Sequence, residues 1–593
     1  MAILLTIVAE IFVFFIRTDL KIYSDWLGEM ALPAYLAGRD WSSALASCSY
    51  YGWGLTWIYT PIFLFSAEPV VIWFGYKIVN IFIISIISAI IYIIQVRWMK
   101  QKENIVTIII AVSIALLTWI DFGKETTLFL GVWISALLFL ETFYGNNAGR
   151  QKWTKLLLSI AVPAVTCYIK NIHESAICLS IVLFLLMGWD YFVAKKKSVY
   201  ICAFVVSWGI TYFLSNLIKA QVLELYTVGV SREIIYNTSA FQGTTLWFLN
   251  TWESVKTLFI LIWSNFYTLA MWTYGMAVFA VFLVMAIIAN AVRKRKLTQV
   301  ISNAPQNGLL FYSLMATLIV VFGVAVNWGS GLYHGIRIGG KAFNYVRYYY
   351  PFFLPALLVC FVYLRQNVER LKKIKVITFY LVDFFATCYL AYLYPIMVGW
   401  SDSGGHIEWK YTYGFCFDRS VPIVQNIIYW IIFVIVFLAV LFWVKSENKY
   451  FFLMMLLCVF SISDRRVELD SDGIMENKFA FPSFTISACD ASEKAIQLLL
   501  ECGIDKKDVF LADHGSYYIY SLQFLLNDIP LQCITTEEGL KVIDDNSIIF
   551  SCQDGLCEHI GQEYERIYLD TDEYLYVKDI ETIRKYLKIL NTT

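Results

Sequence analysis

The sequence predicts a polytopic α-helical membrane protein of about 13 transmembrane helices with a small C-terminal α/β domain. Composition gives the first indication: 59% of the 593 residues are hydrophobic and 16% are charged, whereas soluble domains are about 45–50% apolar and about 25% charged. The second is the recurrence of apolar runs of membrane length. The third is a change to polar composition after about residue 464. A formal net charge of zero gives no sign of a nucleic-acid partner.

The predicted spans follow from the length of these runs, since a hydrocarbon core of about 30 Å needs about 20 apolar residues per helix. They cover residues 2–17, 69–96, 105–120, 126–144, 155–170, 174–193, 199–219, 273–292, 309–327, 350–364, 376–397, 422–444 and 449–463. The stretch 244–272, rich in Trp and Phe, either crosses the membrane or lies along its interface. A crossing there would change the span count and the orientation of everything downstream.

The orientation of the spans follows from basic residues at every second connection. These connections are Arg97–Lys102, Arg150–Lys155, Lys195–Lys197, Arg293–Lys296, Arg365–Lys375 and Lys445–Lys449. Positive charge is retained in cytoplasmic loops, so the N-terminus is predicted to be cytoplasmic. The opposite, outer face then receives 18–68, 121–125, 170–174, 220–272, 328–349, 398–421 and the C-terminus.

Two domains are expected: a transmembrane domain over residues 1–463 and an extracytoplasmic α/β domain over 464–593. Short β-like runs in the second part alternate with helix-like stretches, which favours an α/β fold. The runs are Val509–Ala512, Leu531–Ile534, Ser547–Phe550 and Arg566–Leu569, and the clearest helices are Ala491–Cys502 and Asp579–Leu590. No Gly-rich phosphate loop precedes a helix there.

The first outer loop carries a family resemblance. The run from Asp25 to Ser42 and the motif Tyr50–Gly54 look like the first loop of bacterial GT-C polyprenyl-phosphate-sugar-dependent glycosyltransferases, in the protein mannosyltransferase and aminoarabinose transferase branches. The order of one span, a large outer loop, many spans and a C-terminal outer domain is similar too. Tyr345–Pro351 resembles the aromatic-Arg segment before a late span. Where the family often has Glu after the early Asp, this chain has Trp26, and the nearest Glu is Glu29.

The carboxylates of the outer loops are the candidate catalytic residues. The resemblance implies that Asp25 is the base that deprotonates the acceptor hydroxyl, a role that partial desolvation of a carboxylate favours; otherwise it caps a helix over 26–37. Glu29, one helical turn later, either assists or is a capping or solvated residue. The resemblance also implies a second-loop carboxylate, Asp121 or Glu125. The alternative is an interfacial turn in which Lys124 pairs with one of them.

Cations in two other outer loops are candidates for binding the donor phosphate. Arg337, Lys341 and Arg347 depart from the positive-inside trend, and the planar fork of Arg suits phosphate oxygens. Arg347 with the adjacent Tyr345 is the preferred candidate, and the alternative is a snorkelling cation in an aromatic belt.

The turn Lys170–Glu174 lies between the fifth and sixth predicted spans. Lys170 and His173 there either contact the lipid phosphate or are an ordinary loop charge and a neutral histidine. A single His–Glu pair does not make a metal site, and the 13 cysteines include no CxxC pair. We therefore expect no metal or other cofactor.

The resemblance implies a membrane glycosyltransferase that moves a sugar, with inversion, from a polyprenyl-phosphate carrier to a cell-envelope glycan, lipid or protein on the outer face. A transporter or flippase of lipid-linked saccharides is the main alternative, although such proteins have internal repeats and broken helices near the midplane. A polysaccharide polymerase, a ligase or a non-enzymatic scaffold remains a third reading. The large functional loop of polymerases and ligases falls late in the chain, whereas here the first loop is large.

Overall fold

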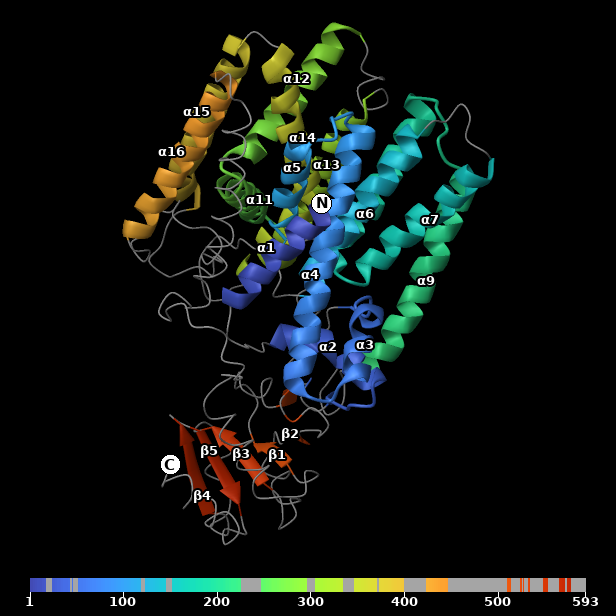
Figure 1. The fold of residues 1–593 in the computed structure, drawn as a ribbon, viewed down its shortest axis with the longest axis vertical. Helices are drawn as coiled ribbons and strands as arrows, with labels where there is room; N and C mark the ends of the chain where they lie inside the picture. Colours follow the sequence, from blue (N-terminus) through green and yellow to red (C-terminus); the bar gives the residue numbers. More distant parts are fainter. Residues whose placement is uncertain are drawn as a thin grey trace.

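The computed structural model shows a helical bundle with a small β-sheet beyond one of its ends (Figure 1). The described residues are 1–16, 24–42, 45, 52–118, 123–145, 152–225, 247–295, 304–333, 346–370, 373–398, 423–445, 509–512, 523–524, 526, 532–533, 548–552, 565–570 and 573–577. The predicted span 449–463 lies outside them, as do the predicted helices Ala491–Cys502 and Asp579–Leu590.

The helices of the first half include two short ones within the predicted first outer loop. In chain order they are α1 (Ala2–Ile16), α2 (Ser24–Leu36), α3 (Thr56–Phe65), α4 (Pro69–Ile93) continued by η2 (Ile94–Trp98), α5 (Ile105–Ala115), α6 (Gly123–Tyr144), α7 (Lys152–Lys170), η3 (Glu174–Ala176), α8 (Ile177–Gly188) continued by η4 (Trp189–Val193), and α9 (Ile201–Leu225). Helix α4 packs against α1, α5 and α6, and α7 packs against α8 and α9.

The second half continues the bundle. Its helices are η6 (Trp247–Leu249), α11 (Trp252–Trp272), α12 (Met276–Arg293), α13 (Pro305–Tyr333), α14 (Val346–Arg370), α15 (Lys373–Val398) and α16 (Ile423–Lys445). Local signals fix several ends: the Thr251 side chain accepts from Ser254 N and Thr251 N donates to Ser254 Oγ, a reciprocal cap of α11. Gly275, at φ +85°, makes the turn between α11 and α12.

Seven helices in the described part of the chain are long and apolar enough to span a membrane. They correspond to predicted spans 69–96, 126–144, 174–193, 199–219, 273–292, 309–327 and 350–364. The chain is therefore a multi-pass membrane protein. The predicted span 105–120 differs, because α5 is an 11-residue helix that ends at Ala115. Residues 116–118 leave the helix in a tight turn, with Leu117 N bonded to Ile114 O and Thr118 N to Ala115 O.

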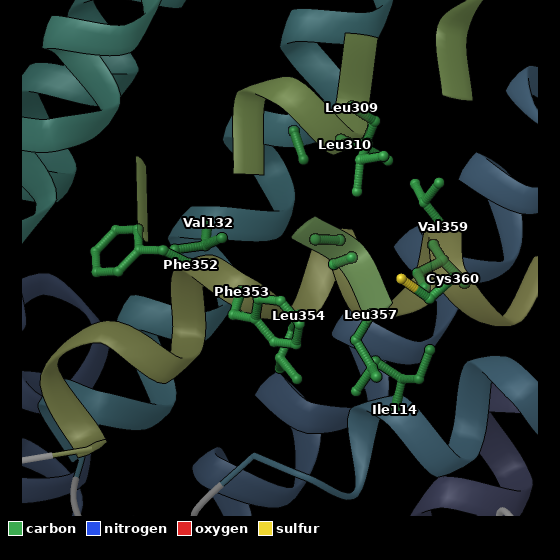
Figure 2. Close-up of a cluster of buried hydrophobic side chains, with 14 of the residues drawn as sticks. Ile114, Val132, Leu309, Leu310, Phe352, Phe353, Leu354, Leu357, Val359 and Cys360 are labelled. Carbon is green, nitrogen blue, oxygen red and sulfur yellow. The ribbon is translucent and has the colours of Figure 1, made fainter. Parts of the chain in front are cut away.

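The core of the bundle lies around α14, because 83% of the most apolar stretch within Tyr348–Gln366 of this helix is buried. Figure 2 shows Phe352, Phe353, Leu354 and Leu357 of this helix in a cluster that also includes Leu309 and Leu310 of α13, with Phe352 beside Val132 of α6. A helix that is apolar on all sides belongs in the centre of a helical assembly. Within the ambiguous stretch 244–272, residues 247–249 form η6 and residues 252–272 form α11, and α11 packs against α13 and α15.

The C-terminal sheet has five strands in the order β2-β1-β3-β5-β4. They are β1 (Val509–Ala512), β2 (Gln532–Cys533), β3 (Ile548–Cys552), β4 (Glu565–Asp570) and β5 (Glu573–Val577). β1 pairs in parallel with β2 and β3, and β5 pairs antiparallel with β3 and β4. Each predicted β-like run overlaps one of the first four strands. The division into two domains and the soluble nature of the second stay predictions.

Candidate active site

Helix α2 carries the two carboxylates predicted in the first loop. Trp26, Leu27, Met30, Ala31 and Ala34 of this helix are almost fully buried, so one face of α2 packs into the protein. Asp25 lies in its first turn, and its side chain is outside the described residues. The helix contains Gly28 and Pro33, two poor helix formers, so packing must supply much of its stability.

Glu29 belongs to a buried charge cluster with Lys124 at its centre. Lys124 Nζ lies 3.5 Å from Glu29 Oε1 and 3.8 Å from Glu125 Oε1, and all three side chains are inaccessible to solvent or nearly so. Glu29 Oε2 also accepts a hydrogen bond from Lys124 N at 3.2 Å. That backbone group is in the first turn of α6, where N–H groups lack helical partners and a negative charge is favourable. The cluster therefore ties α2 to the start of α6.

This geometry decides between the readings of these residues. The alternative of a solvated Glu29 is wrong, because the side chain is buried. The alternative of a capping residue agrees with the structure, since the Glu29 carboxylate accepts from a backbone N–H in the first turn of α6. The predicted Lys124–Glu125 pair is present, and both side chains are buried within the protein. Neither Glu125 carboxyl oxygen has a hydrogen bond among the described residues. Asp121 lies outside the described residues.

Tyr59 of α3 lies beside this cluster. Tyr59 is fully buried and donates a hydrogen bond to Asn80 Oδ1 of α4 at 2.6 Å. Burial, with smaller contributions from the charges of Glu29 and Glu125, raises the pKa of the Tyr59 phenol, so the phenol stays protonated. Its ring packs on Tyr76 at 5.2 Å. A Cβ at Gly123 would lie 2.9 Å from the Tyr59 hydroxyl, which leaves room only for glycine.

Residues 52–54, the described part of the Tyr50–Gly54 motif, lie against the predicted donor-phosphate turn. Gly54 N donates to Asn171 O at 2.8 Å, and Tyr168 OH donates to Gly54 O at 2.6 Å. At Gly52, with φ +124°, a Cβ would come within 2.0 Å of Asn171 O. The Trp53 indole donates to Ser215 O of α9 at 3.3 Å. The first loop and the turn at 170–174 therefore lie on one side of the bundle.

His173 of this turn contacts the start of α14. Its Nδ1 accepts from Ser175 N at 3.2 Å and lies 2.7 Å from Ser175 Oγ. That arrangement assigns the ring hydrogen of a neutral imidazole to Nε2. The ring lies 5.2 Å from that of Tyr348, the residue after Arg347. His173 is buried, so the turn and the aromatic-Arg segment meet.

Lys170 takes a different position. Its Nζ lies 4.4 Å from the Tyr212 ring centroid, a cation–π contact with α9. Three other candidates for binding the donor phosphate, Arg337, Lys341 and Tyr345, lie outside the described residues. Arg347 lies in the first turn of α14, and its side chain is outside them too. The structure thus brings Glu29 and Glu125 together on either side of Lys124. It also brings His173 into contact with Tyr348, the residue after Arg347.

Sequence reasoning missed the partners that hold these residues. Asn80 lies in an apolar run, where an amide needs a buried partner, and that signal was available. The role of Tyr59 had no sequence signal of its own. Among the described residues no group of three His, Cys, Asp or Glu side chains is close enough to hold a metal ion.

The fold is a polytopic helical membrane bundle with two short helices, α2 and α3, in its first loop. No family model and no curated protein matches the chain. Among solved structures it is similar to ArnT from Cupriavidus metallidurans bound to undecaprenyl phosphate, with a TM-score of 0.54, 10% identity and 98% of each chain covered. The apo state of that ArnT gives a TM-score of 0.52, 11% identity and the same coverage. This likeness confirms the predicted fold.

Proposed function

We propose that this protein is an inverting membrane glycosyltransferase that takes a sugar from a polyprenyl-phosphate carrier. The acceptor is a cell-envelope glycan, lipid or protein at the outer face of a bacterial membrane. The fold supports this, since one similar structure, that of ArnT, contains undecaprenyl phosphate. The N-terminus would be cytoplasmic and the C-terminal region extracytoplasmic, as the basic loops predict.

The observation that carries the proposal is the buried cluster of Glu29, Lys124 and Glu125. Charges in a membrane protein are costly to bury and mark functional sites. This cluster ties α2, whose first turn contains Asp25, to α6, which begins two residues after Asp121 in the sequence. Two helix starts with adjacent acidic residues are thereby fixed relative to one another, as a site with two carboxylates requires.

The reaction is a single displacement at the anomeric carbon. Asp25 accepts the proton of the acceptor hydroxyl while that oxygen forms a bond to the anomeric carbon. The bond from this carbon to the phosphate oxygen breaks, and polyprenyl phosphate leaves with the electron pair. Attack opposite the leaving group inverts the configuration. We assign no step to a metal ion.

The leaving phosphate gains negative charge, which cations and N–H donors stabilise. Arg347 is the proposed principal partner, with His173 beside it through the contact with Tyr348. Lys170, Arg337, Lys341 and Tyr345 are proposed to line the same region. Glu29 and Glu125 act chiefly by holding α2 and α6 in place, because Lys124 occupies the space between them.

The test uses purified protein and a panel of radiolabelled polyprenyl-phosphate sugars with cell-envelope acceptors. Transfer of label supports the enzyme, whereas movement of the intact lipid-linked sugar across vesicles without transfer supports a flippase instead.

The matched variants are Asp25→Asn and Asp40→Asn. Asp40 is an exposed residue of the same loop whose carboxylate caps Ser42 N at 2.9 Å. Asp25→Asn should abolish transfer with normal expression and membrane insertion, and Asp40→Asn should retain it. Normal transfer by Asp25→Asn would defeat the assignment of the base.

A further inference from the structure

A short segment of the C-terminal region packs directly on α2. Phe524 is fully buried, and its ring lies 5.0 Å from Trp26, edge to face at 85°. It also lies 6.4 Å from Trp41 at 82°. Gln523 is fully buried and Leu526 nearly so. Phe524 and Trp41, which lie near opposite ends of the chain, thus share one aromatic contact.

Phe524 belongs to an aromatic cluster that spans three elements of the bundle. Trp26 packs on Trp73 at 5.9 Å and on Tyr76 at 5.5 Å, both in α4. Trp41 packs on Phe63 of α3 at 5.7 Å. Phe524 contacts both tryptophans, so it joins the α4 side of this aromatic cluster to the α3 side.

The position of Trp26 gives this contact its significance. Trp26 follows Asp25 directly in α2, at the place where the sequence lacks the Glu expected from the resemblance. Its side chain is 2% exposed. Because α2 is a 13-residue helix that contains Gly28 and Pro33, it depends on tertiary contacts. The charge cluster holds it through Glu29, and the aromatic cluster holds it through Trp26.

We infer that Phe524 is a positioning residue for α2, so that the C-terminal region forms part of the candidate active site. Loss of the ring would let the first turn of α2, which carries Asp25, move away from its place. The consequence for sugar transfer rests on the proposed function. The consequence for the order of α2 does not, since it follows from packing alone.

The structural test is hydrogen–deuterium exchange of the full chain in detergent. Phe524→Ala should speed amide exchange within 24–36 by about 2- to 10-fold, the range that an aromatic pair contributes. Leu526→Ala, in the same segment, is the matched control and should change exchange in 24–36 by less. Exchange in β3 and β5, followed in the same samples, shows that the sheet remains folded.

A double-mutant cycle separates ring contact from general packing. Phe524→Leu keeps most of the side-chain volume and removes the ring. If the two rings act through each other, Phe524→Leu should have little further effect on α2 exchange once Trp26→Leu is present. Additive effects of the two substitutions would overturn the inference. So would unchanged exchange in α2 for Phe524→Ala with a folded sheet.

Sugar-transfer assays then test the consequence of the Phe524 contact for catalysis. A positioning role predicts that Phe524→Ala lowers kcat while the KM for the lipid-linked donor stays close to the wild-type value, and that Phe524→Leu is intermediate. Faster transfer by Phe524→Ala would show an inhibitory contact and overturn the inference. If the wild-type chain transfers no sugar, the proposed function fails, and the exchange experiment still decides the role of Phe524.

Discussion

Removal of the buried ammonium of Lys124 should be far more damaging than removal of either carboxylate. Lys124→Met keeps a similar side-chain length and leaves Glu29 and Glu125 together without the cation between them. Glu29→Gln leaves one ammonium beside one carboxylate. The predicted order of destabilisation is therefore Lys124→Met well above Glu29→Gln, with Glu125→Gln similar to Glu29→Gln.

The magnitude follows from the distances in the cluster. At an effective dielectric constant of about 20, the Lys124 charge interacts with Glu29 at 3.5 Å by about 5 kcal/mol and with Glu125 at 3.8 Å by about 4 kcal/mol. Desolvation of the ammonium offsets part of this gain. Breaking a buried pair by removing one partner costs about 3–5 kcal/mol, and we expect Lys124→Met to fall in that range.

The assay is thermal inactivation in detergent, read as the half-life at a fixed temperature, because large membrane proteins unfold irreversibly. The triple variant Glu29→Met, Lys124→Met and Glu125→Met is the informative control. Replacing a whole buried charge cluster by apolar residues of similar volume is often neutral or stabilising, so this variant should recover most of the half-life. A half-life for Lys124→Met equal to that of Glu29→Gln would refute the reasoning.

Three further predictions concern the first outer loop, and the last of them also concerns position 347. Gly52→Ala should weaken its packing on the turn at 170–174 and shorten the thermal half-life, because a Cβ would overlap Asn171 O; Gly209→Ala, in open space in α9, should have no such effect, and equal half-lives would contradict the packing. Arg39→Gln should speed hydrogen exchange in α3, since the guanidinium donates to Phe63 O at 2.7 Å and Ser66 O at 2.8 Å; unchanged exchange would show that these bonds do not hold α3. Single cysteines at positions 25 and 347 should be labelled from the same, outer side of the membrane, and labelling from opposite sides would end the proposal.

The helical part of the fold could be predicted because hydropathy and length depend only on local sequence. Seven predicted spans appear as helices of spanning length. The run 105–120 was equally apolar, yet α5 stops at Ala115. Its Val106, Ile110 and Ile114 are buried within the protein, so they pack against neighbouring helices. Hydropathy predicts the apolar run but not the residue at which its helix ends.

The candidate site was less predictable because its contacts join distant segments. Glu29 and Lys124 are 95 positions apart, and nothing in the local sequence around Glu29 distinguishes a buried carboxylate from a solvated one. The glycines of the Tyr50–Gly54 motif gave a partial signal, since such residues mark close backbone approaches. The sequence did not show that the approach at Gly52 is to Asn171.

Trp26 shows how a departure from an expected motif acquires a physical meaning. By sequence alone, a bulky indole after Asp25 counted only as the loss of a second acidic group. In the structure its ring is buried between α4 and the C-terminal segment. The negative charge that a Glu at position 26 would carry is present instead at Glu29, about one helical turn later. The Glu29 carboxylate pairs with Lys124. We therefore argue that two residues of α2 have separate tasks. Glu29 anchors the helix to α6 by charge, and Trp26 anchors it to the C-terminal region by aromatic packing. Asp25 lies in the first turn of the helix, directly before Trp26.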